Sequence, residues 1–212
     1  QKKNKENIKQ QYFIEANINN KYPFRGEQIV LTYSLYTKVN LSSFDFSKMS
    51  SFKGFWSKDL YTPRNLQFRE KKIDNQIWYV STVKEVALFP TKSGEIIINP
   101  ATIIIGVKTA SNRRTLDFFG DDFFGRSKQV TLATNQIELE VKALPNNNNK
   151  PSSAVGKWDI SSFINNKKLK QDEAFTYSII IKGTGNIKSI EPLEINFPKS
   201  LEIFDPEINV VD

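Results

Sequence analysis

The side chains that could do chemistry in this chain are carboxylates and indoles, without the partners that usually activate them. The 212 residues include no His and no Cys, which removes the commonest general base, the commonest transition-metal ligand and the thiol nucleophile. The carboxylates that could form a catalytic pair are Asp45, Asp59, Asp74 and Glu95. A glycosidase would need two of them about 5 to 10 Å apart in an aromatic cleft. The indoles that could line such a cleft are those of Trp56, Trp78 and Trp158.

Short motifs do not support catalysis. The sequence contains no nucleophile elbow, phosphate-binding loop or dinucleotide fingerprint. We therefore expect neither an enzymatic activity nor a cofactor. An extracytoplasmic ligand- or glycan-binding module stays open as the alternative function, and it requires Trp56 and neighbouring aromatic rings to be exposed and roughly coplanar.

The segment from Thr109 to Lys128 is the strongest candidate for a binding site. It lies between two predicted strands and contains two Phe pairs, Phe118-Phe119 and Phe123-Phe124, among Gly and Asp residues. Four Phe side chains in water would cost roughly 1.5 to 3 kcal/mol each relative to burial, so they must pack against something. Adjacent residues of an extended chain point to opposite sides, so one face can pack at home while the other stays available.

Three interpretations of this segment differ in what it contacts. The Phe side chains fold back on their own module or the next one, or they dock a partner protein, or the Asp residues bind calcium. The calcium interpretation uses Asp117, Asp121 and Asp122, whose spacing fits no known coordinating loop. We predict a partner-binding site with Phe anchors and an Arg rim. Its residues are Arg113, Arg114, Phe118, Phe119, Phe123, Phe124 and Arg126.

Alternating apolar and polar residues predict an all-β fold that would position these residues. The alternation is clear from Ile29 to Tyr36 and from Ile137 to Lys142. Two longer runs rich in β-branched residues, Trp78 to Leu88 and Ile96 to Val107, are also expected to be strands. Between them, Pro90 and Ser93-Gly94 predict a corner that joins two strands of a β-sandwich, with Gly94 free to take a positive φ.

Composition agrees with a β protein that buries a core. The chain is 39% hydrophobic, with 16 Phe, 7 Tyr and 3 Trp. Its net charge is +7, but Lys residues are interspersed with acids along most strands, so we expect no nucleic-acid site. No run of about 18 apolar residues is present, and the polar, Lys-rich start is not a signal peptide. We therefore expect that a signal was removed or that the chain is an excerpt of something longer.

A polar segment and an internal repeat predict two tandem modules. Residues 146–153, Asn146 to Ser153, have no apolar side chain and are expected to be a linker between a module at 10–145 and a second one at 154–212. The sequence Ile-Asn-Asn-Lys begins at Ile18 and recurs at Ile164, an offset of 146 residues that also aligns Glu27 with Glu173. Both copies are expected to be immunoglobulin-like β-sandwiches. The second is too short for about seven strands, so the natural protein is expected to continue beyond Asp212.

Several long motifs resemble the BatD family of aerotolerance-operon proteins. The run from Val86 to Thr102 is similar to that family's A-L-F-P-T-K-S-G-E-L-T-I followed by D-P-A-T, with Asn99 in place of the acid. Other matches in the same order are Gly26 to Asn40, Ser51 to Trp56, Arg113 to Gly125, Val141 to Pro145, Ala154 to Gly156, Gly183 to Lys188 and Phe204 to Pro206. A departure from the family is Asp172, where Gly or Asn usually precedes the Glu.

This resemblance implies a location and partners. BatD proteins are periplasmic, carry several β-sandwich modules and are held in the inner membrane by a helix, which would lie outside this chain. The implied partners are Bat proteins with von Willebrand A-type domains or tetratricopeptide repeats, and indirectly a MoxR-type AAA+ ATPase. We therefore expect a non-catalytic assembly protein that docks partner proteins, with this chain as a middle module and the first half of the next.

Overall fold

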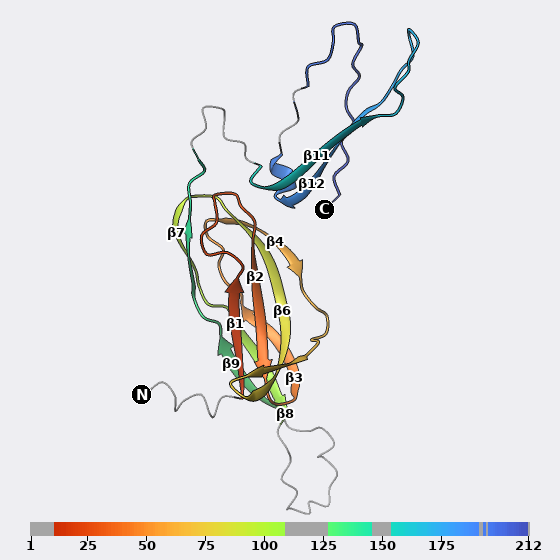
Figure 1. Cartoon of the computed structure of the whole chain (residues 1–212). Helices are drawn as coiled ribbons and strands as arrows, with labels where there is room; N and C mark the ends of the chain where they lie inside the picture. The colour runs from red at the N-terminus through yellow and green to blue at the C-terminus, as the bar shows by residue number, and fades with distance from the viewer. Residues whose placement is uncertain (1–10, 109–126, 146–153, 191–192, 194, 212) are drawn as a thin grey trace, which may run out of the picture.

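The computed structural model describes residues 11–108, 127–145, 154–190, 193 and 195–211, and this part of the chain is all-β, as predicted (Figure 1). The strands are β1 (Tyr12–Ile18), β2 (Ile29–Thr37), β3 (Leu41–Lys48), β4 (Phe55–Tyr61), β5 (Arg69–Ile73), β6 (Gln76–Pro90), β7 (Gly94–Ile98), β8 (Thr102–Lys108), β9 (Ser127–Ala133), β10 (Ile137–Val141), β11 (Gly156–Ile164) and β12 (Tyr177–Gly185). A single 3-10 turn, η1 (Ile187–Ser189), is the helical content of the described residues.

Strands β1 to β10 form two layers. One layer is a five-stranded antiparallel sheet in the order β1-β2-β6-β4, with β5 also paired to β6. Strand β6 is long enough to pair with β2 along one edge and with both β5 and β4 along the other. The alternation predicted in β2 is confirmed, because Ile29, Leu31, Tyr33 and Leu35 are completely buried. These residues point toward the second layer.

The second layer consists of a three-stranded sheet, β3-β8-β9, and the pair β10-β7. Its inward side chains form one core cluster with those of the first layer, so the two layers make a sandwich (Figure 1). Ile96, Ile98, Ile103, Ile105 and Leu139 contribute to this core from the second layer. Each of these strands has the period-2 pattern of a sheet with one buried face.

The expected continuous strand from Ile96 to Val107 is interrupted at Pro100, and this part of the prediction was wrong. The chain forms β7 before the interruption and β8 after it, and the two strands pair with β10 and β9, respectively. Pro100 has no N–H to offer to a ladder. Next to it, the Ala101 N–H donates to Thr134 Oγ1 at 3.0 Å and the Thr134 N–H donates to the Ala101 carbonyl at 2.9 Å. These two bonds join the segment between β7 and β8 to the segment between β9 and β10.

The corner around Pro90 joins two strands of the sandwich, as predicted, and the structure shows that it carries the chain from one layer to the other. Strand β6 ends at Pro90 in the first layer, and β7 begins at Gly94 in the second. Gly94 has φ +102°, the positive value that its position in the turn was expected to need. The Pro90 carbonyl accepts from the Gly26 N–H at 2.8 Å, and the Thr91 N–H donates to the Gly54 carbonyl at 2.9 Å. The corner is thus held by the turns on either side of it.

Strand β1 and the residues that follow it close one side of the sandwich by contacts with the second layer. The side chain of Asn135 binds the backbone of Ala16 twice: its Oδ1 accepts from the Ala16 N–H at 2.9 Å, and its Nδ2 donates to the Ala16 carbonyl at 3.0 Å. Farther along, Phe24 forms a parallel bridge with Lys142 just after β10. The Asn135 contacts occupy polar groups on the edge of β1 that would otherwise be free to pair with another chain.

Strands β11 and β12 form a separate two-stranded sheet, which we call the second hairpin (residues 156–185), and it repeats the β1-β2 hairpin. In the first copy, the Val30 N–H donates to Asn19 Oδ1 and the Phe24 N–H donates to Glu27 Oε2. At an offset of 146 residues, the same bonds recur. In the second copy, the Thr176 N–H donates to Asn165 Oδ1 and the Lys170 N–H donates to Glu173 Oε2.

Backbone geometry repeats as well. Gly26 has φ +81°, and Asp172, at the same offset, has φ +67°. The internal repeat predicted from sequence is therefore a repeated loop structure. Residues 146–153 lie outside the described residues, so the linker, and with it the division into modules at 10–145 and 154–212, stays a prediction.

Candidate interaction surface

The predicted partner-binding residues between the second-layer strands are not placed by the structure. Arg113, Arg114, Phe118, Phe119, Phe123, Phe124 and Arg126 lie outside the described residues, as do the three Asp residues of the calcium interpretation. The binding role of this segment therefore stays a prediction. A candidate surface has to be sought among the described residues.

The structure does not bring the four candidate carboxylates together. Asp45 lies on β3, Asp59 on β4, Asp74 in the β5-β6 turn and Glu95 on β7. Asp59 is paired with Lys84 at 2.7 Å, and Glu95 stands directly opposite Glu140 on the exposed face of the β10-β7 pair. Within the described residues, no group of three acidic side chains is arranged to hold a metal ion.

The indoles do not form a shared platform for a ligand. Trp78 is buried on the outer side of the first sheet, where Phe13 packs edge-on against it and Lys38 Nζ lies 4.1 Å from its ring centre. Trp56 is exposed, but its ring is tilted by 53° from that of its neighbour Phe89. A glycan platform needs exposed, roughly coplanar rings, so this arrangement favours a different kind of surface.

A pocket of about 300 Å³ lies beside Trp56 at the end of the sandwich near the second hairpin. Phe89, Pro90 and Thr91 of the corner line it, and so do Val155, Asn186 and Ser189 from the chain around the second hairpin. Arg25 is the charged residue in this lining. A lone cation among apolar and neutral groups supplies no pair of groups for acid-base chemistry.

Two Tyr hydroxyls have shifted pKa values, and both belong to the packing of the sandwich. Burial raises the pKa of Tyr33 above its ordinary value, and a hydrogen bond of 2.8 Å from its hydroxyl to Ser50 Oγ partly offsets this rise. Burial also raises the pKa of Tyr36, and the nearby Glu15 carboxylate adds to the rise. Both phenols are therefore held in the neutral form and provide no reactive anion.

The second hairpin leaves partly exposed the apolar face that its counterpart in the first module buries. The register of β11 with β12 puts one set of alternate side chains on the same face, which we call the open face. Its apolar residues are Trp158, Ile160, Ile164, Tyr177, Ile179 and Ile181. Ile160 is 59% exposed, whereas the equivalent Ile14 is 5% exposed, and Tyr177 is 39% exposed, whereas the equivalent Leu31 is fully buried.

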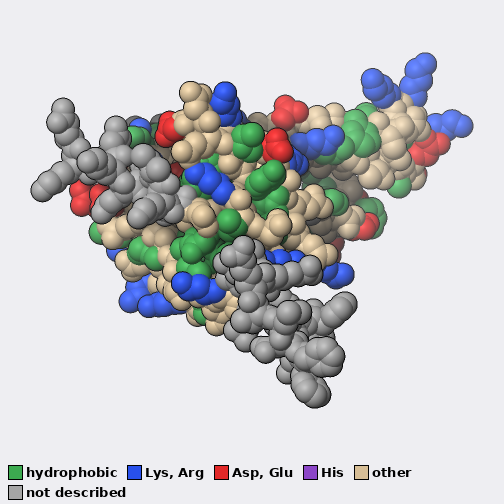
Figure 2. Space-filling model, turned by 90° about the horizontal axis from the view of Figure 1, so that it is seen from below, with side chains coloured by type: hydrophobic (Ala, Val, Ile, Leu, Met, Phe, Trp, Pro, Cys, Tyr) green, Lys and Arg blue, Asp and Glu red, His purple; other side chains and the backbone are tan. Residues whose placement is uncertain are grey.

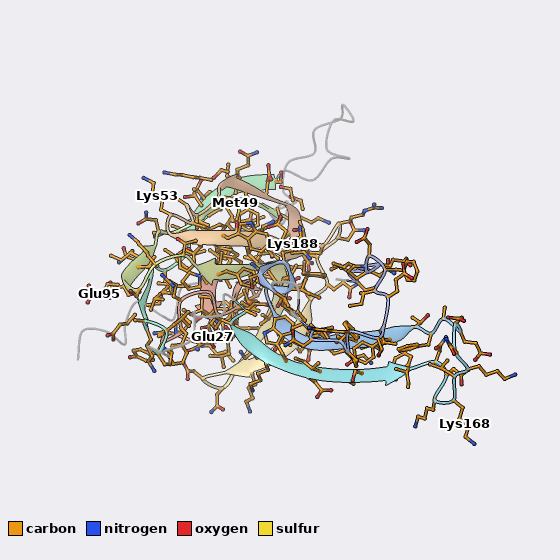
Figure 3. All side chains as sticks on the ribbon, turned by 90° about the horizontal axis from the view of Figure 1, so that it is seen from above. Glu27, Met49, Lys53, Glu95, Lys168 and Lys188 are labelled. Carbon is orange, nitrogen blue, oxygen red and sulfur yellow. The ribbon has the colours of Figure 1, made fainter. Side chains whose placement is uncertain are left out.

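The surroundings of the second hairpin cover this face in part, since Trp158, Ile164, Ile179 and Ile181 are half-buried. Figure 2 shows hydrophobic side chains along the hairpin, with Lys side chains at its tip, where Figure 3 labels Lys168. Phe197 packs edge-on against Tyr177, with 5.9 Å between ring centres. The other side of the same hairpin also exposes Phe163 and Ile180. The described residues after β12 form no further strand to cover it.

Two glycines and one indole give the second hairpin its shape. Trp158 stands opposite Gly183, and its Nε1 donates to the Ala154 carbonyl at 3.2 Å. A Cβ on Gly183 would lie 2.6 Å from the Trp158 ring, and one on Gly185 would lie 2.7 Å from it. The ring therefore lies over bare backbone, so the Gly-Thr-Gly motif is required by packing. Sequence reasoning noted the motif but did not connect it with Trp158.

Comparisons with known proteins neither support nor oppose the family resemblance. No model of a protein family, no curated protein and no solved structure matches this chain. Within the described residues, no helix has the length and apolar character needed to cross a bilayer. The surface of the second hairpin is thus the feature on which a functional proposal can rest.

Proposed function

We propose that this chain is part of a non-catalytic assembly protein whose β-sandwich modules dock partner proteins at the cell envelope. The observation that carries the proposal is the open face of the second hairpin. Ile160 and Tyr177 on this face are exposed and its other apolar side chains are partly exposed, and exposed apolar patches on soluble proteins mark sites of interaction. Each large side chain covered by a partner contributes roughly 1.5 to 3 kcal/mol to association before the costs of binding.

The strand order supports an immunoglobulin-like assignment for the first module. The order β1-β2-β6-β4 corresponds to strands A-B-E-D of a constant-type immunoglobulin domain, and β3-β8-β9 corresponds to C-F-G. The interrupted strands β7 and β10 extend F and G in this scheme. Such sandwiches recur in cell-surface and periplasmic proteins that work by binding, although the fold by itself does not define a function.

The BatD resemblance extends the proposal to a setting. Several of its motifs coincide with residues that the fold requires, including Gly26 and Gly94 with positive φ and Gly183 beneath Trp158. We infer a periplasmic protein anchored in the inner membrane, with von Willebrand A-type and tetratricopeptide-repeat Bat proteins as partners. A MoxR-type ATPase would be linked to it indirectly.

Capture of partners from native membranes by the intact protein tests the proposal. We expect the variant Ile160→Ser to lose most of the captured Bat proteins, because it removes an apolar side chain from the centre of the open face. Ile77→Ser is the matched control, since Ile77 is 58% exposed and lies on β6, away from the second hairpin. Equal capture by both variants and the unmodified protein would contradict docking through the open face.

A further inference from the structure

The pocket beside Trp56 has the size and the position of a small-molecule site. Its volume of about 300 Å³ lies at the lower end of the range for ligand pockets, roughly 300 to 1,000 Å³. Its walls come from the end of the sandwich and from the chain around the second hairpin, and junctions of this kind are frequent places for ligand sites. The pocket is therefore a candidate binding site that is separate from the open face.

One wall of the pocket is aromatic and apolar. Trp56 on β4 stands opposite Phe89 on β6, with 5.1 Å between their ring centres. Phe89 is buried, whereas Trp56 is 41% exposed, so the indole still has surface to offer to a ligand. The half-buried side chains of Leu144 and Val155 also line the pocket. An apolar group that enters it removes this surface from water, which favours binding.

The charge of the pocket comes from Arg25. Its side chain is exposed, and within the described residues no ion pair involves its guanidinium. A guanidinium can donate two parallel hydrogen bonds to a carboxylate, a geometry that suits a planar anion. A cationic ligand would be repelled by Arg25, and a neutral one would leave its charge unused. The lining therefore favours an anion with an apolar body.

Main-chain bonds hold the lining in place without a ligand. The Arg25 N–H donates to the Lys142 carbonyl at 2.9 Å, and the Gly26 N–H donates to the Pro90 carbonyl at 2.8 Å. Across the pocket, the side chain of Asn186 caps the 3-10 turn η1. A site whose backbone is already fixed loses less conformational freedom when the ligand binds.

We propose that this pocket binds a small organic carboxylate with an aromatic or branched apolar body. The carboxylate pairs with the Arg25 guanidinium, and the body lies against Trp56 and Phe89. Because the volume is at the lower limit for ligand pockets, we assign the ligand as a free small molecule and not as the end of a polypeptide. The site does not depend on the proposed docking function. A ligand that contacts both walls would also hold the second hairpin against the sandwich.

Calorimetric titration of the protein with N-acetylphenylalanine tests the chemistry of this site. We expect one site that saturates below about 10 mM. The uncharged N-acetylphenylalaninamide should bind about fivefold more weakly, because Arg25 is exposed and its ion pair is partly screened. In Arg25→Gln the acid should lose this advantage and bind no better than the amide. Arg64→Gln is the matched control, since Arg64 is also exposed, lies between β4 and β5 and does not line the pocket.

Nuclear magnetic resonance locates the bound acid. We expect shifts of the Trp56 indole N–H signal and of the Gly26 and Ser189 amide signals, one from each wall of the pocket, and about tenfold weaker binding by Trp56→Ala. Shifts on one wall alone would contradict a site built from both. If Ile160→Ser loses partner capture but still binds the acid, the two sites are independent, as we expect.

Four results would overturn the proposal. They are failure to saturate, equal binding of the acid and the amide by the unmodified protein, inorganic phosphate that binds as tightly as N-acetylphenylalanine, and the same loss of affinity in Arg64→Gln as in Arg25→Gln. Tighter binding of a peptide that ends in Phe than of N-acetylphenylalanine would overturn the assignment to a small molecule in favour of a chain end.

Discussion

Replacing Asn135 should weaken the sandwich by the loss of two hydrogen bonds that join its layers. The side chain binds both the N–H and the C=O of Ala16, at 2.9 and 3.0 Å. Asn135 is itself exposed, so water can reach the freed groups and the net value of about 1 kcal/mol per bond applies, not the full cost of an unpaired buried group. We expect Asn135→Ala to lower the free energy of unfolding by about 2 kcal/mol. That loss lowers the melting temperature by about 4 to 8 °C.

Two further variants show whether the effect belongs to this pair of bonds. Asn135→Asp keeps the acceptor for the Ala16 N–H but places a carboxylate oxygen against the Ala16 carbonyl, so it should cost about 1 kcal/mol or more. Gln136→Ala removes a 2.9 Å bond between two exposed side chains and should cost under about 0.5 kcal/mol. Urea unfolding followed by Trp fluorescence measures all three. If Asn135→Ala and Gln136→Ala have the same stability, the closing role given to Asn135 is wrong.

Two other predictions concern the repeated turn and the buried phenol. Asp172→Gly should stabilise the second hairpin by up to about 1 kcal/mol, because it removes the cost of a non-Gly residue at φ +67°. Slower amide exchange in β12 would show this gain, and faster exchange would contradict it. Tyr33→Phe should cost about 1 kcal/mol at neutral pH, because Ser50 loses its partner. Above pH 10 the unfolded chain ionises Tyr33 at its ordinary pKa, whereas burial raises the pKa of Tyr33 in the folded state, so stability falls as pH rises. The drop in the urea midpoint from pH 8 to pH 11 should therefore be smaller in Tyr33→Phe than in the unmodified protein. An equal fall would refute the assignment.

Local patterns in the sequence predicted much of the fold. The alternation from Ile29 to Leu35 correctly identified a buried face, and the corner from Pro90 to Gly94 was placed between two strands. The repeat at Ile18 and Ile164 was predicted from four identical residues and the alternation after them. Side-chain caps such as Asn19 and Asn165 explain why those residues recur, since each Asn bonds the backbone across its loop.

Long-range pairing was harder to predict. A run of β-branched residues from Ile96 to Val107 looks continuous, because nothing local shows that its two halves pair with different strands. The two hydrogen bonds of the Asn135 side chain join residues 119 positions apart, and neither segment carries a sequence pattern that predicts them. The open face was not singled out, because Ser162 interrupts the apolar alternation of β11 and exposure depends on what else packs there. The predicted Phe-rich contact segment stays outside the described residues.

The repeated loop has a consequence for the order in which a module is built during synthesis. Its bonds join residues no more than 11 positions apart, so they can form as soon as that segment leaves the ribosome. We expect each module to start from its first two strands, which then serve as a template for later ones. In the first module the edge of β2 that such a template offers is the one that β6 occupies.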